Sequence, residues 1–378
     1  MEWKEDILGN VLEVKYGKDH KKLAEGQYPV YGSGGLMRYV DSKLYDGPSI
    51  LIPRKGTLNN IMFVESPFWT VDTMFWTIIN TDKIDPKFLF YSICKRDFAS
   101  MNVGSAVPSM TVRILNDIQI SYPKNLDDQR RIASILSSLD RKIELNNKIN
   151  ADLEEMAQAI FKNWFVDFEP FKDGKFVDSE LGMIPEEWKI GTLTDVIKLM
   201  PGGTPKTSEP LYWDNGTIPF FSPKDVNGVY CFTTEKHITE TGLNKCSSNL
   251  YPKDTIFITC RGTVGKVCLT ACDMAMNQSN YAIKAIDGYS QCYVFFLVKS
   301  VVERLIKKSN GAVFSAITSK DFDEEILIPS QKAVEDFTNV IDGFFRRIFT
   351  IGTENSRLSL LRDTLLPRLM SGELEIPE

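Results

Sequence analysis

The residues best suited to ligand chemistry occur twice, each time at the end of a predicted buried strand. The first copy is Arg54-Lys55-Gly56-Thr57, and the second is the run RGTVGK at residues 261–266. Glycine lets the backbone approach a ligand closely, arginine can hold a phosphate or a guanine edge with two hydrogen bonds, and threonine can donate to phosphate. A single copy would be interpreted as a tight hairpin whose charge faces water. The duplication favours a contact with DNA.

Polar side chains suited to base edges lie near both turns in the sequence. For any one of them, a solvated loop side chain is the alternative interpretation. The candidate DNA-binding residues are Ser33, Arg54, Lys55, Thr57 and Asn59 in the first half, and Ser222, Lys224, Arg261, Thr263, Lys266, Asn277 and Gln278 in the second.

Motifs of known enzyme classes are missing from the sequence. It contains no phosphate-binding G-x-x-x-x-G-K-[ST] loop, no G-x-G-x-x-G after a strand, no H-E-x-x-H and no G-x-S-x-G. A base methyltransferase would need a glycine-rich cofactor turn and an Asn/Asp-Pro-Pro-aromatic loop, and neither occurs. With only two histidines and seven irregularly spaced cysteines, we expect reduced thiols, no metal and no cofactor. We therefore expect a chain that is not an enzyme.

Composition limits the possible surroundings and partners of the chain. Its 378 residues, of which 43% are hydrophobic, suffice for two domains with separate cores. No apolar run approaches the ~20 residues that cross a bilayer, and the start MEWKEDILGN does not resemble a signal peptide. We expect a cytoplasmic protein that does not bind membranes. The net charge of −6 counts against a surface that is basic throughout, so contact with DNA would require local basic loops.

The elements that position these turns are themselves repeated along the chain. Setting Gly56 against Gly262 gives an offset of 206 (262 − 56), and one offset holds across a whole domain. Closer to the start of each repeat the offset is smaller: Trp3 matches Trp188, 185 residues later. A tandem duplication with different surface loops predicts two related sites with different preferences, although a purely structural duplication is the alternative. The pairs at offset 206 include Tyr45 with Tyr251, Ile50 with Ile256, Ala106-Val107 with Ala312-Val313, and Pro123 with Pro329.

Two long helices are predicted after the two repeats, at residues 127–165 and 332–370. Apolar residues alternate three and four apart, and polar residues replace a few of them, which is typical of a coiled coil with a fixed register. Two core helices of separate domains are the alternative. Pro367 is expected to end or kink the second helix. The predicted helix-interface residues are Ile132, Ile135, Leu139, Asn146, Ile149, Leu153, Ile341, Phe344, Ile348, Asn355 and Leu358.

In their order, these motifs resemble the specificity subunits of type I restriction-modification systems. Each motif is loose, but their duplicated order covers nearly the whole chain. In the first half the resemblance rests on YPVYGSGG (28–35), GPSILIPRKGT (47–57) and NWFVDFEP (163–170). In the second half it rests on GGTP (202–205), IPFFSPKD (218–225), RGTVGK (261–266), NQ (277–278) and LLPRLMSGE (365–373).

The resemblance implies an α+β fold in which two pseudo-repeated α/β target-recognition domains are separated by two long antiparallel coiled-coil helices. The expected parts are a first target-recognition domain at 1–125, a central helix at 126–166, a second target-recognition domain at 167–330 and a C-terminal helix at 331–378. The first domain lacks the Gly-Thr-Pro segment found at residues 203–205, so contact positions before Tyr45 do not transfer between the halves.

The resemblance also implies partners. Each domain would read one half of a bipartite, asymmetric site in double-stranded DNA, and the helices would fix the unread spacer. Two DNA adenine methyltransferase subunits, which carry S-adenosylmethionine, would dock on the helices, and restriction subunits would supply ATP-dependent translocation and cleavage. A coiled-coil adaptor with paired protein-binding domains is the alternative. Binding to DNA without sequence preference or salt dependence would favour that alternative.

Overall fold

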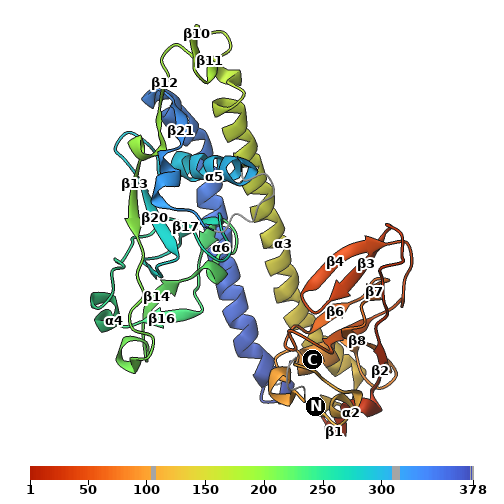
Figure 1. Cartoon of the computed structure of the whole chain (residues 1–378). Coiled ribbons are helices and arrows are strands. Elements are labelled where there is room, and N and C mark those ends of the chain that lie inside the picture. Colours follow the sequence, from red (N-terminus) through yellow and green to blue (C-terminus); the bar gives the residue numbers. More distant parts are fainter. Residues whose placement is uncertain (104–107, 309–315, 375, 377–378) are drawn as a thin grey trace. The chain divides into compact units, whose positions relative to one another are not determined.

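The computed structural model describes residues 1–103, 108–308, 316–374 and 376 (Figure 1). The pairing of Ala106-Val107 with Ala312-Val313 lies outside these residues. The described chain forms two compact units, one from Met1–Ile143 and Leu358–Glu378 and the other from Glu144–Arg357. Within the described ranges, no helix combines the length and the apolar character that a membrane crossing requires.

Unit 1 contains a four-stranded sheet in the order β2-β8-β5-β6, a three-stranded sheet β4-β3-β7 and the pair β1-β9. The strands are β1 (Trp3–Ile7), β2 (Leu12–Tyr16), β3 (Tyr28–Gly32), β4 (Gly35–Val40), β5 (Ser49–Pro53), β6 (Met62–Val64), β7 (Trp69–Thr70), β8 (Met74–Ile79) and β9 (Gln119–Pro123). The short helices are α1 (Pro86–Ile93) and α2 (Val112–Asn116).

Unit 2 contains a five-stranded sheet β13-β20-β17-β18-β15, a three-stranded sheet β16-β14-β19 and the pairs β12-β21 and β10-β11. The strands are β10 (Phe176–Ser179), β11 (Gly182–Pro185), β12 (Lys189–Thr192), β13 (Ile197–Pro201), β14 (Ile218–Phe221), β15 (Tyr230–Cys231), β16 (Lys236–Ile238), β17 (Ile256–Thr259), β18 (Val267–Thr270), β19 (Ala275–Met276), β20 (Asn280–Ala285) and β21 (Glu325–Ile328). The other helices of this unit, apart from the two long ones, are the five-residue α4 (Glu240–Asn244) and the 18-residue α5 (Gln291–Lys308).

The two units share one topology, as the sequence offsets predict. At offset 206, β8 corresponds to β20 and β7 to β19 from the first residue to the last, and at offset 185 β2 corresponds to β13 in the same way. Isolated bridges repeat as well, because Tyr45 pairs with Phe68 and Tyr251 with Met274. The duplication is therefore visible in the backbone pairing. Unit 2 adds β15 to its main sheet and has a longer helix α5 in place of α1.

The central strand β5 shows why the apolar run SILIP forms a strand. All five of its residues are buried, and they lie between β8 and β6. The one polar side chain, Ser49, is satisfied because its hydroxyl donates to the Thr77 carbonyl oxygen at 2.8 Å and accepts from the Thr77 amide at 2.9 Å. A buried hydroxyl without such partners would destabilise the sheet.

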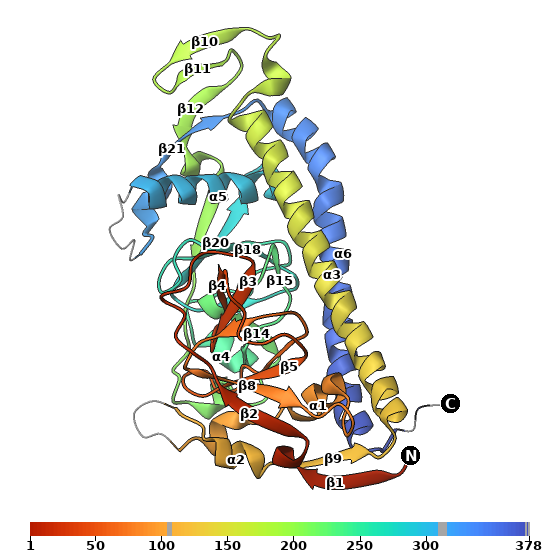
Figure 2. The same cartoon turned by 90° about the vertical axis from the view of Figure 1, so that its right-hand side faces the viewer.

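The two long helices are α3 (Leu126–Phe165) and α6 (Gln331–Met370), each 40 residues long. Each helix contributes residues to both units. In unit 1, Ile132 of α3 packs in the same core as Leu366 and Leu369 of α6. In unit 2, Phe161 and Phe165 of α3 pack with Phe337 of α6. The helices are therefore antiparallel within each unit (Figure 2), and the fold class predicted from the sequence is confirmed.

A polar layer interrupts the apolar contacts between α3 and α6 in unit 2. The side-chain amide of Asn146, which is 1% exposed, donates to the carboxylate of Glu354 and to the side-chain oxygen of Asn355, both at 2.8 Å. Asn355 in turn donates to Asn147 at 2.8 Å. Because other registers would leave Asn146 buried without partners, this layer favours one alignment of the two helices.

Two details of the helices differ from the sequence expectations. The three-four alternation that runs through Ile149 and Leu153 predicts Met156 as the next contact, but Met156 is 54% exposed and Ala157 is fully buried in its place. The contact stripe thus drifts around α3, as the 3.6-residue period of a straight helix requires. Pro367 does not end α6, which continues to Met370. Proline is tolerated there because it lies in the last turn, where its missing N–H removes a single backbone hydrogen bond. Its carbonyl oxygen still accepts from the Ser371 amide at 3.0 Å.

In unit 1, a cluster of polar side chains joins the two long helices to helix α1. Asp140 of α3 accepts a hydrogen bond from the Tyr91 hydroxyl of α1 at 2.6 Å and from the Arg362 guanidinium of α6 at 2.7 Å. Burial, together with the hydrogen bond to Asp140, raises the pKa of Tyr91 above its usual value, so the phenol remains a donor. One carboxylate therefore ties three helices together.

The positions equivalent to this cluster in unit 2 are apolar. The helices α1 and α3 begin 205 residues before α5 and α6, which is one residue fewer than the offset of the strands. At this offset, the equivalents of Tyr91 and Asp140 are Phe296 and Phe345, whose rings pack edge to face with centroids 5.7 Å apart. The equivalent of Arg362 is the fully buried Ala157 (362 − 205). The contact between the long helices and the shorter helix therefore uses charged side chains in unit 1 and aromatic side chains in unit 2.

We predict that Arg362→Met lowers the stability of unit 1 by about 1–3 kcal/mol, because it leaves the half-buried Asp140 carboxylate with one partner fewer. Urea denaturation followed by circular dichroism measures the shift in midpoint. Arg357→Met, at an exposed position of the same helix, is the matched control and should leave the midpoint unchanged. Equal midpoints for the two variants would contradict a stabilising role of the cluster.

Candidate nucleic-acid interface

In unit 2, four loops meet at one edge of the sheets. β14 and β19 are parallel, so their carboxyl ends lie together, and the Asn277 amide donates to the Phe221 carbonyl oxygen at 3.0 Å. The loop after β13 joins them through the Gly203 amide, which donates to the Met276 carbonyl oxygen at 3.0 Å. The loop after β17 joins through the Cys260 amide and the Ser279 carbonyl oxygen, 2.8 Å apart. Residues that are up to about 80 positions apart in sequence thus form one surface.

The turn at residues 261–266 is held rigidly from within. The fully buried Thr259 hydroxyl donates to the Thr263 carbonyl oxygen and accepts from the Lys266 amide at 3.0 Å. Gly262 has φ +81°, a conformation that other residues rarely adopt. Arg261, Thr263 and Lys266 are exposed. The turn therefore presents its polar side chains from a fixed backbone, which limits the entropy lost on binding.

The other candidate residues of unit 2 divide into two groups. Ser222 and Asn277 hold the loops: the Ser222 hydroxyl donates to Asp225 at 2.8 Å, and the Asn277 side-chain oxygen accepts from the Ser279 amide at 2.9 Å. Lys224 points outward, with 82% of its side chain exposed. Gln278 is also exposed, and its side-chain oxygen accepts from the Thr204 hydroxyl.

Unit 1 repeats this convergence of loops with other side chains. The Val71 amide donates to the Tyr31 carbonyl oxygen at 3.1 Å, and the Arg54 amide donates to the Thr73 carbonyl oxygen at 2.8 Å. These bonds correspond to those of Asn277 and Cys260 in unit 2. Lys55 forms an isolated bridge with Ser109, as Arg261 does with Ala316, so Lys55 rather than Arg54 is the structural equivalent of Arg261.

The candidate residues of unit 1 lie around the turn that contains Gly56, where φ is +89°. The Ser33 carbonyl oxygen accepts from the Asn60 amide group at 2.8 Å, which places the β3-β4 turn beside this one. The Arg54 guanidinium donates to the Asp72 carbonyl oxygen at 3.2 Å and lies 5.4 Å from the centre of the Tyr16 ring.

The remaining candidates of unit 1 again divide into holding and exposed residues. Lys55 and Thr57 are exposed. The Asn59 side chain is used within the protein, because its oxygen accepts from the Ala99 amide at 2.9 Å and its amide donates to Asp97 at 3.2 Å. Of the five candidates in this unit, Asn59 is therefore the one engaged at both ends of its side chain.

Two glycines let the loops meet, and this role was not predicted from the sequence, although Gly202 belongs to the GGTP motif named above. A Cβ atom on Gly202 would lie 2.1 Å from the Asn277 carbonyl oxygen, and one on Gly17 would lie 2.0 Å from the Val71 carbonyl oxygen. The signal was available, because these glycines are 185 residues apart, the offset that also relates Trp3 and Trp188. Both units thus depend on the same close backbone approach.

The cysteines are suited to packing rather than to nucleophilic chemistry. All seven are free thiols. Burial raises the pKa of Cys94 to about 11 and the pKa of Cys231, Cys260 and Cys292 to about 12, so these groups remain protonated near neutral pH. Among the described residues, no three His, Cys, Asp or Glu side chains gather in a way that could hold a metal ion.

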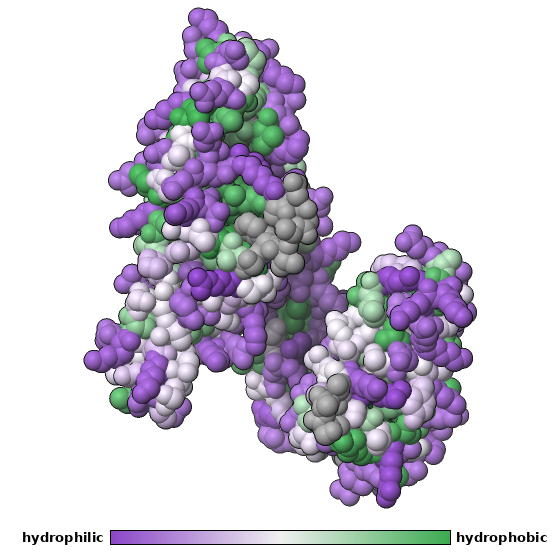
Figure 3. Space-filling view, in the orientation of Figure 1, coloured by the Kyte–Doolittle hydropathy of each residue, from purple (hydrophilic) through white to green (hydrophobic). Residues whose placement is uncertain are grey.

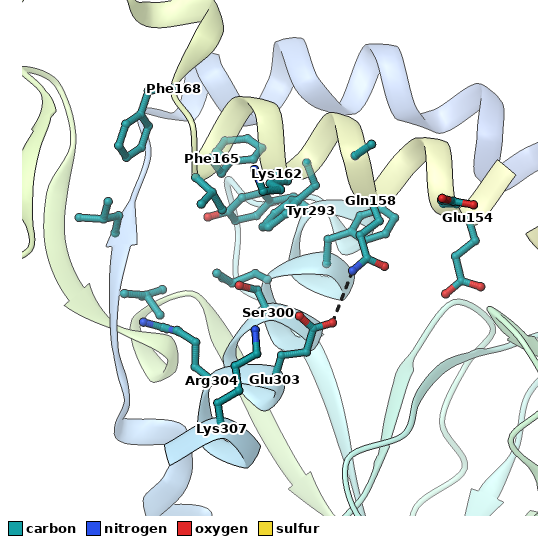
Figure 4. Close-up of a pocket in the computed structure, with 18 of the residues that line it drawn as sticks. Glu154, Gln158, Lys162, Phe165, Phe168, Tyr293, Ser300, Glu303, Arg304 and Lys307 are labelled. Atoms are coloured by element: carbon teal, nitrogen blue, oxygen red, sulfur yellow. Dashed lines mark hydrogen bonds between the residues drawn. The ribbon is translucent and has the colours of Figure 1, made fainter. Parts of the chain in front are cut away.

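A second surface feature is a groove of about 960 Å³ in unit 2, between α3 and α5 (Figure 4). Its floor is aromatic and includes Phe165 and Tyr293, and its rim is charged. Lys299 and Glu154 form an ion pair of 2.6 Å near one end, while Arg304 and Lys307 lie near the other. Large exposed apolar side chains also line the groove, namely Val166, 51% exposed, and Leu181, 44% exposed.

Comparisons with known proteins agree on one family. A family model described as "Type I restriction modification DNA specificity domain" matches residues 1–155 and 185–346. The type I restriction enzyme MjaIX specificity subunit of Methanocaldococcus jannaschii is 28% identical over 377 residues, covering 95% of this chain and 86% of that protein. The HindI specificity subunit of Haemophilus influenzae is 27% identical, covering 83% of each chain.

The fold also matches a solved structure. The crystal structure of the type I restriction-modification system S subunit from M. genitalium aligns with a TM-score of 0.60 at 15% sequence identity. The alignment covers 97% of this chain and 96% of that chain. At this identity the likeness concerns the fold, and it extends over both units and both long helices.

We predict that Gly202→Ala destabilises unit 2 by about 1–3 kcal/mol or more, because the new Cβ atom would overlap backbone atoms that cannot move away. Thermal and urea unfolding measure the effect. Gly343→Ala in α6 is the control, since its Cβ would meet nothing within 4 Å and alanine favours a helix. An unchanged stability of Gly202→Ala would show that the loops do not need this close approach.

Proposed function

The chain belongs to the family of type I restriction modification DNA specificity domains, and we propose that it reads a bipartite, asymmetric DNA site as the specificity subunit of a methyltransferase and restriction complex. The observation that carries this proposal is the repeated loop cluster. Both units build it from the same backbone contacts, and each presents different side chains. One frame with two sets of side chains is what an asymmetric site in two parts requires.

The exposed cations of the two clusters would provide the first contacts with DNA. Lys55 in unit 1 and Arg261 in unit 2 occupy equivalent positions in their turns. An arginine can bind the O6 and N7 atoms of guanine together, whereas a lysine acts as a single charged donor. The two units would therefore favour different bases from the same position. Binding should weaken with added salt, because cations that approach DNA displace counterions from its phosphates, and salt opposes this displacement.

The chemistry would be performed by partner subunits. We infer that adenine methyltransferase subunits, which carry S-adenosylmethionine, bind this chain, and that a restriction subunit supplies cleavage. The chain itself would be non-catalytic. The continuous 40-residue helices, to which both units are attached, give a physical basis for an unread spacer of fixed length.

The groove between α3 and α5 is our candidate docking surface for a methyltransferase subunit. Its aromatic floor, the exposed Val166 and Leu181, and a rim that carries both acidic and basic side chains suit an amphipathic helix. A monomer that leaves such side chains exposed along a groove gains stability when a partner covers them.

We predict that a host carrying this chain and its methyltransferase methylates adenines in one two-part sequence, and that the pattern disappears when the gene is deleted. Methylome sequencing tests this. Arg261→Ala should relax or abolish recognition of one half-site, and Lys55→Ala that of the other, each with a loss in affinity of about 5- to 150-fold at the base contacted.

Lys189→Ala, at an exposed position on β12 outside the loop cluster, is the matched control and should leave the pattern unchanged. Methyl transfer by the purified chain alone would contradict its role as a non-catalytic subunit. An equal loss on unrelated sequences for both variants would identify these side chains as phosphate contacts. Binding without any sequence preference would favour the adaptor function.

For the groove, we predict that the double variant Val166→Glu/Leu181→Glu weakens binding of the methyltransferase subunit at least tenfold, because two buried carboxylates would replace apolar contacts. Analytical ultracentrifugation or co-purification measures the complex. Val340→Glu on α6, 46% exposed and not part of the groove, is the control. Equal assembly of both variants would exclude this groove as the docking surface.

A further inference from the structure

The β3-β4 hairpin of unit 1 presents two adjacent large apolar side chains to solvent. Leu36 is 52% exposed and Met37 is 55% exposed. Neighbouring residues of a regular strand point to opposite faces, but this strand is irregular. Tyr31 pairs with Leu36 whereas Val30 pairs with Arg38, so Met37 is an extra residue in β4. Such a bulge redirects side chains, and it frequently occurs next to functional sites.

The hairpin lies beside the basic turn of unit 1. Ser33 in the hairpin turn accepts from Asn60, and its hydroxyl oxygen lies 3.1 Å from the position that a Cβ atom on Gly56 would take. The hairpin that carries the exposed apolar residues therefore lies beside the turn that contains Arg54 and Lys55. Figure 3 shows hydrophobic atoms on the surface over β3 and β4, next to hydrophilic ones.

A second basic segment is fastened to the same hairpin. The Arg38 guanidinium donates to the carbonyl oxygens of Leu23 at 2.5 Å and of His20 at 3.4 Å. This holds the loop at residues 18–24, in which three lysines, at positions 18, 21 and 22, are exposed. Asp19 is the acidic side chain within this loop, and the Lys21 amide lowers the pKa of its carboxyl group. The hairpin that carries the apolar pair is thus hydrogen-bonded to two segments that expose basic side chains, and this setting suits a polyanion better than a neutral apolar partner.

Unit 2 has no such pair at the equivalent turn. The segment after β14 is the capped turn Ser222–Asp225, where Lys224 is the most exposed side chain. The two loop clusters therefore differ in chemical character. One offers apolar groups together with cations, and the other offers polar and cationic groups.

We propose that Leu36 and Met37 contact the C5-methyl group of thymine in the major groove, so that unit 1 selects an A·T pair at that position. This inference rests on the proposed function. The thymine methyl is the one apolar group that base edges display in the major groove. Burying it against Leu36 and Met37 removes apolar surface of both molecules from water, and an unmethylated pyrimidine does not offer this gain.

The test replaces thymine by deoxyuracil, which removes the methyl group and keeps the base pairing. The chain in complex with its methyltransferase is titrated with duplexes in which one half-site at a time carries this replacement. We expect a loss of about fourfold in affinity per contacted methyl, which corresponds to about 0.8 kcal/mol, in one half-site only. Leu36→Ser/Met37→Ser should bind the thymine duplex more weakly and should no longer distinguish thymine from uracil.

Leu360→Ser, at a position 70% exposed on α6, is the matched control and should keep the full thymine preference. Three results would overturn the inference: equal binding of thymine and uracil in both half-sites, a half-site of unit 1 without any A·T pair, or a double variant that keeps the preference. A failure of the proposed function is distinguishable, because the wild-type complex would then show no preference for any sequence.

Discussion

The antiparallel pairing of α3 with α6 is the interaction on which the rest of the structure depends. Neither helix is apolar all round, so each one requires the other to cover its buried stripe. Both helices also supply core residues to both units, as Ile132 does in unit 1 and Phe337 does in unit 2. Any change in helix register would therefore disturb two hydrophobic cores at once. The buried Asn146, whose partners lie on α6, adds a polar reason for a single register.

The different contacts of the long helices in the two units show why α3 pairs with α6 and not with a second copy of α3. Asp140 is satisfied by Arg362, which α6 supplies, whereas the α3 residue equivalent to Arg362 is Ala157. If α3 met a second copy of α3 in the same geometry, Asp140 would face an alanine and lose its ion pair. Because unit 1 uses charged groups at this contact and unit 2 uses Phe296 and Phe345, the pairing of α3 with α6 is favoured.

The sequence was sufficient to predict the frame but not the roles of single loop residues. The offset of 206 predicted equivalent strands, and the heptad pattern predicted paired helices, because both depend on regular backbone periods. Asn59 and Asn277 were selected for their amide groups, yet the structure places those groups in bonds that hold loops. Leu36 and Met37 were missed, since exposure at a bulge depends on strand register, and register is not encoded by residue type alone.

The division between residues that hold loops and residues that face outward explains how such a frame can change its preference. Thr259 fixes the turn of unit 2 from a fully buried position, while Arg261 and Lys266 project from that turn and contribute little to its folding. Substitution of an outward residue therefore alters the surface without loss of stability. In unit 1 the surface is altered by a change in the backbone as well as by the choice of side chains. The bulge at Met37 adds one residue to a strand, and this presents apolar groups where unit 2 presents a lysine.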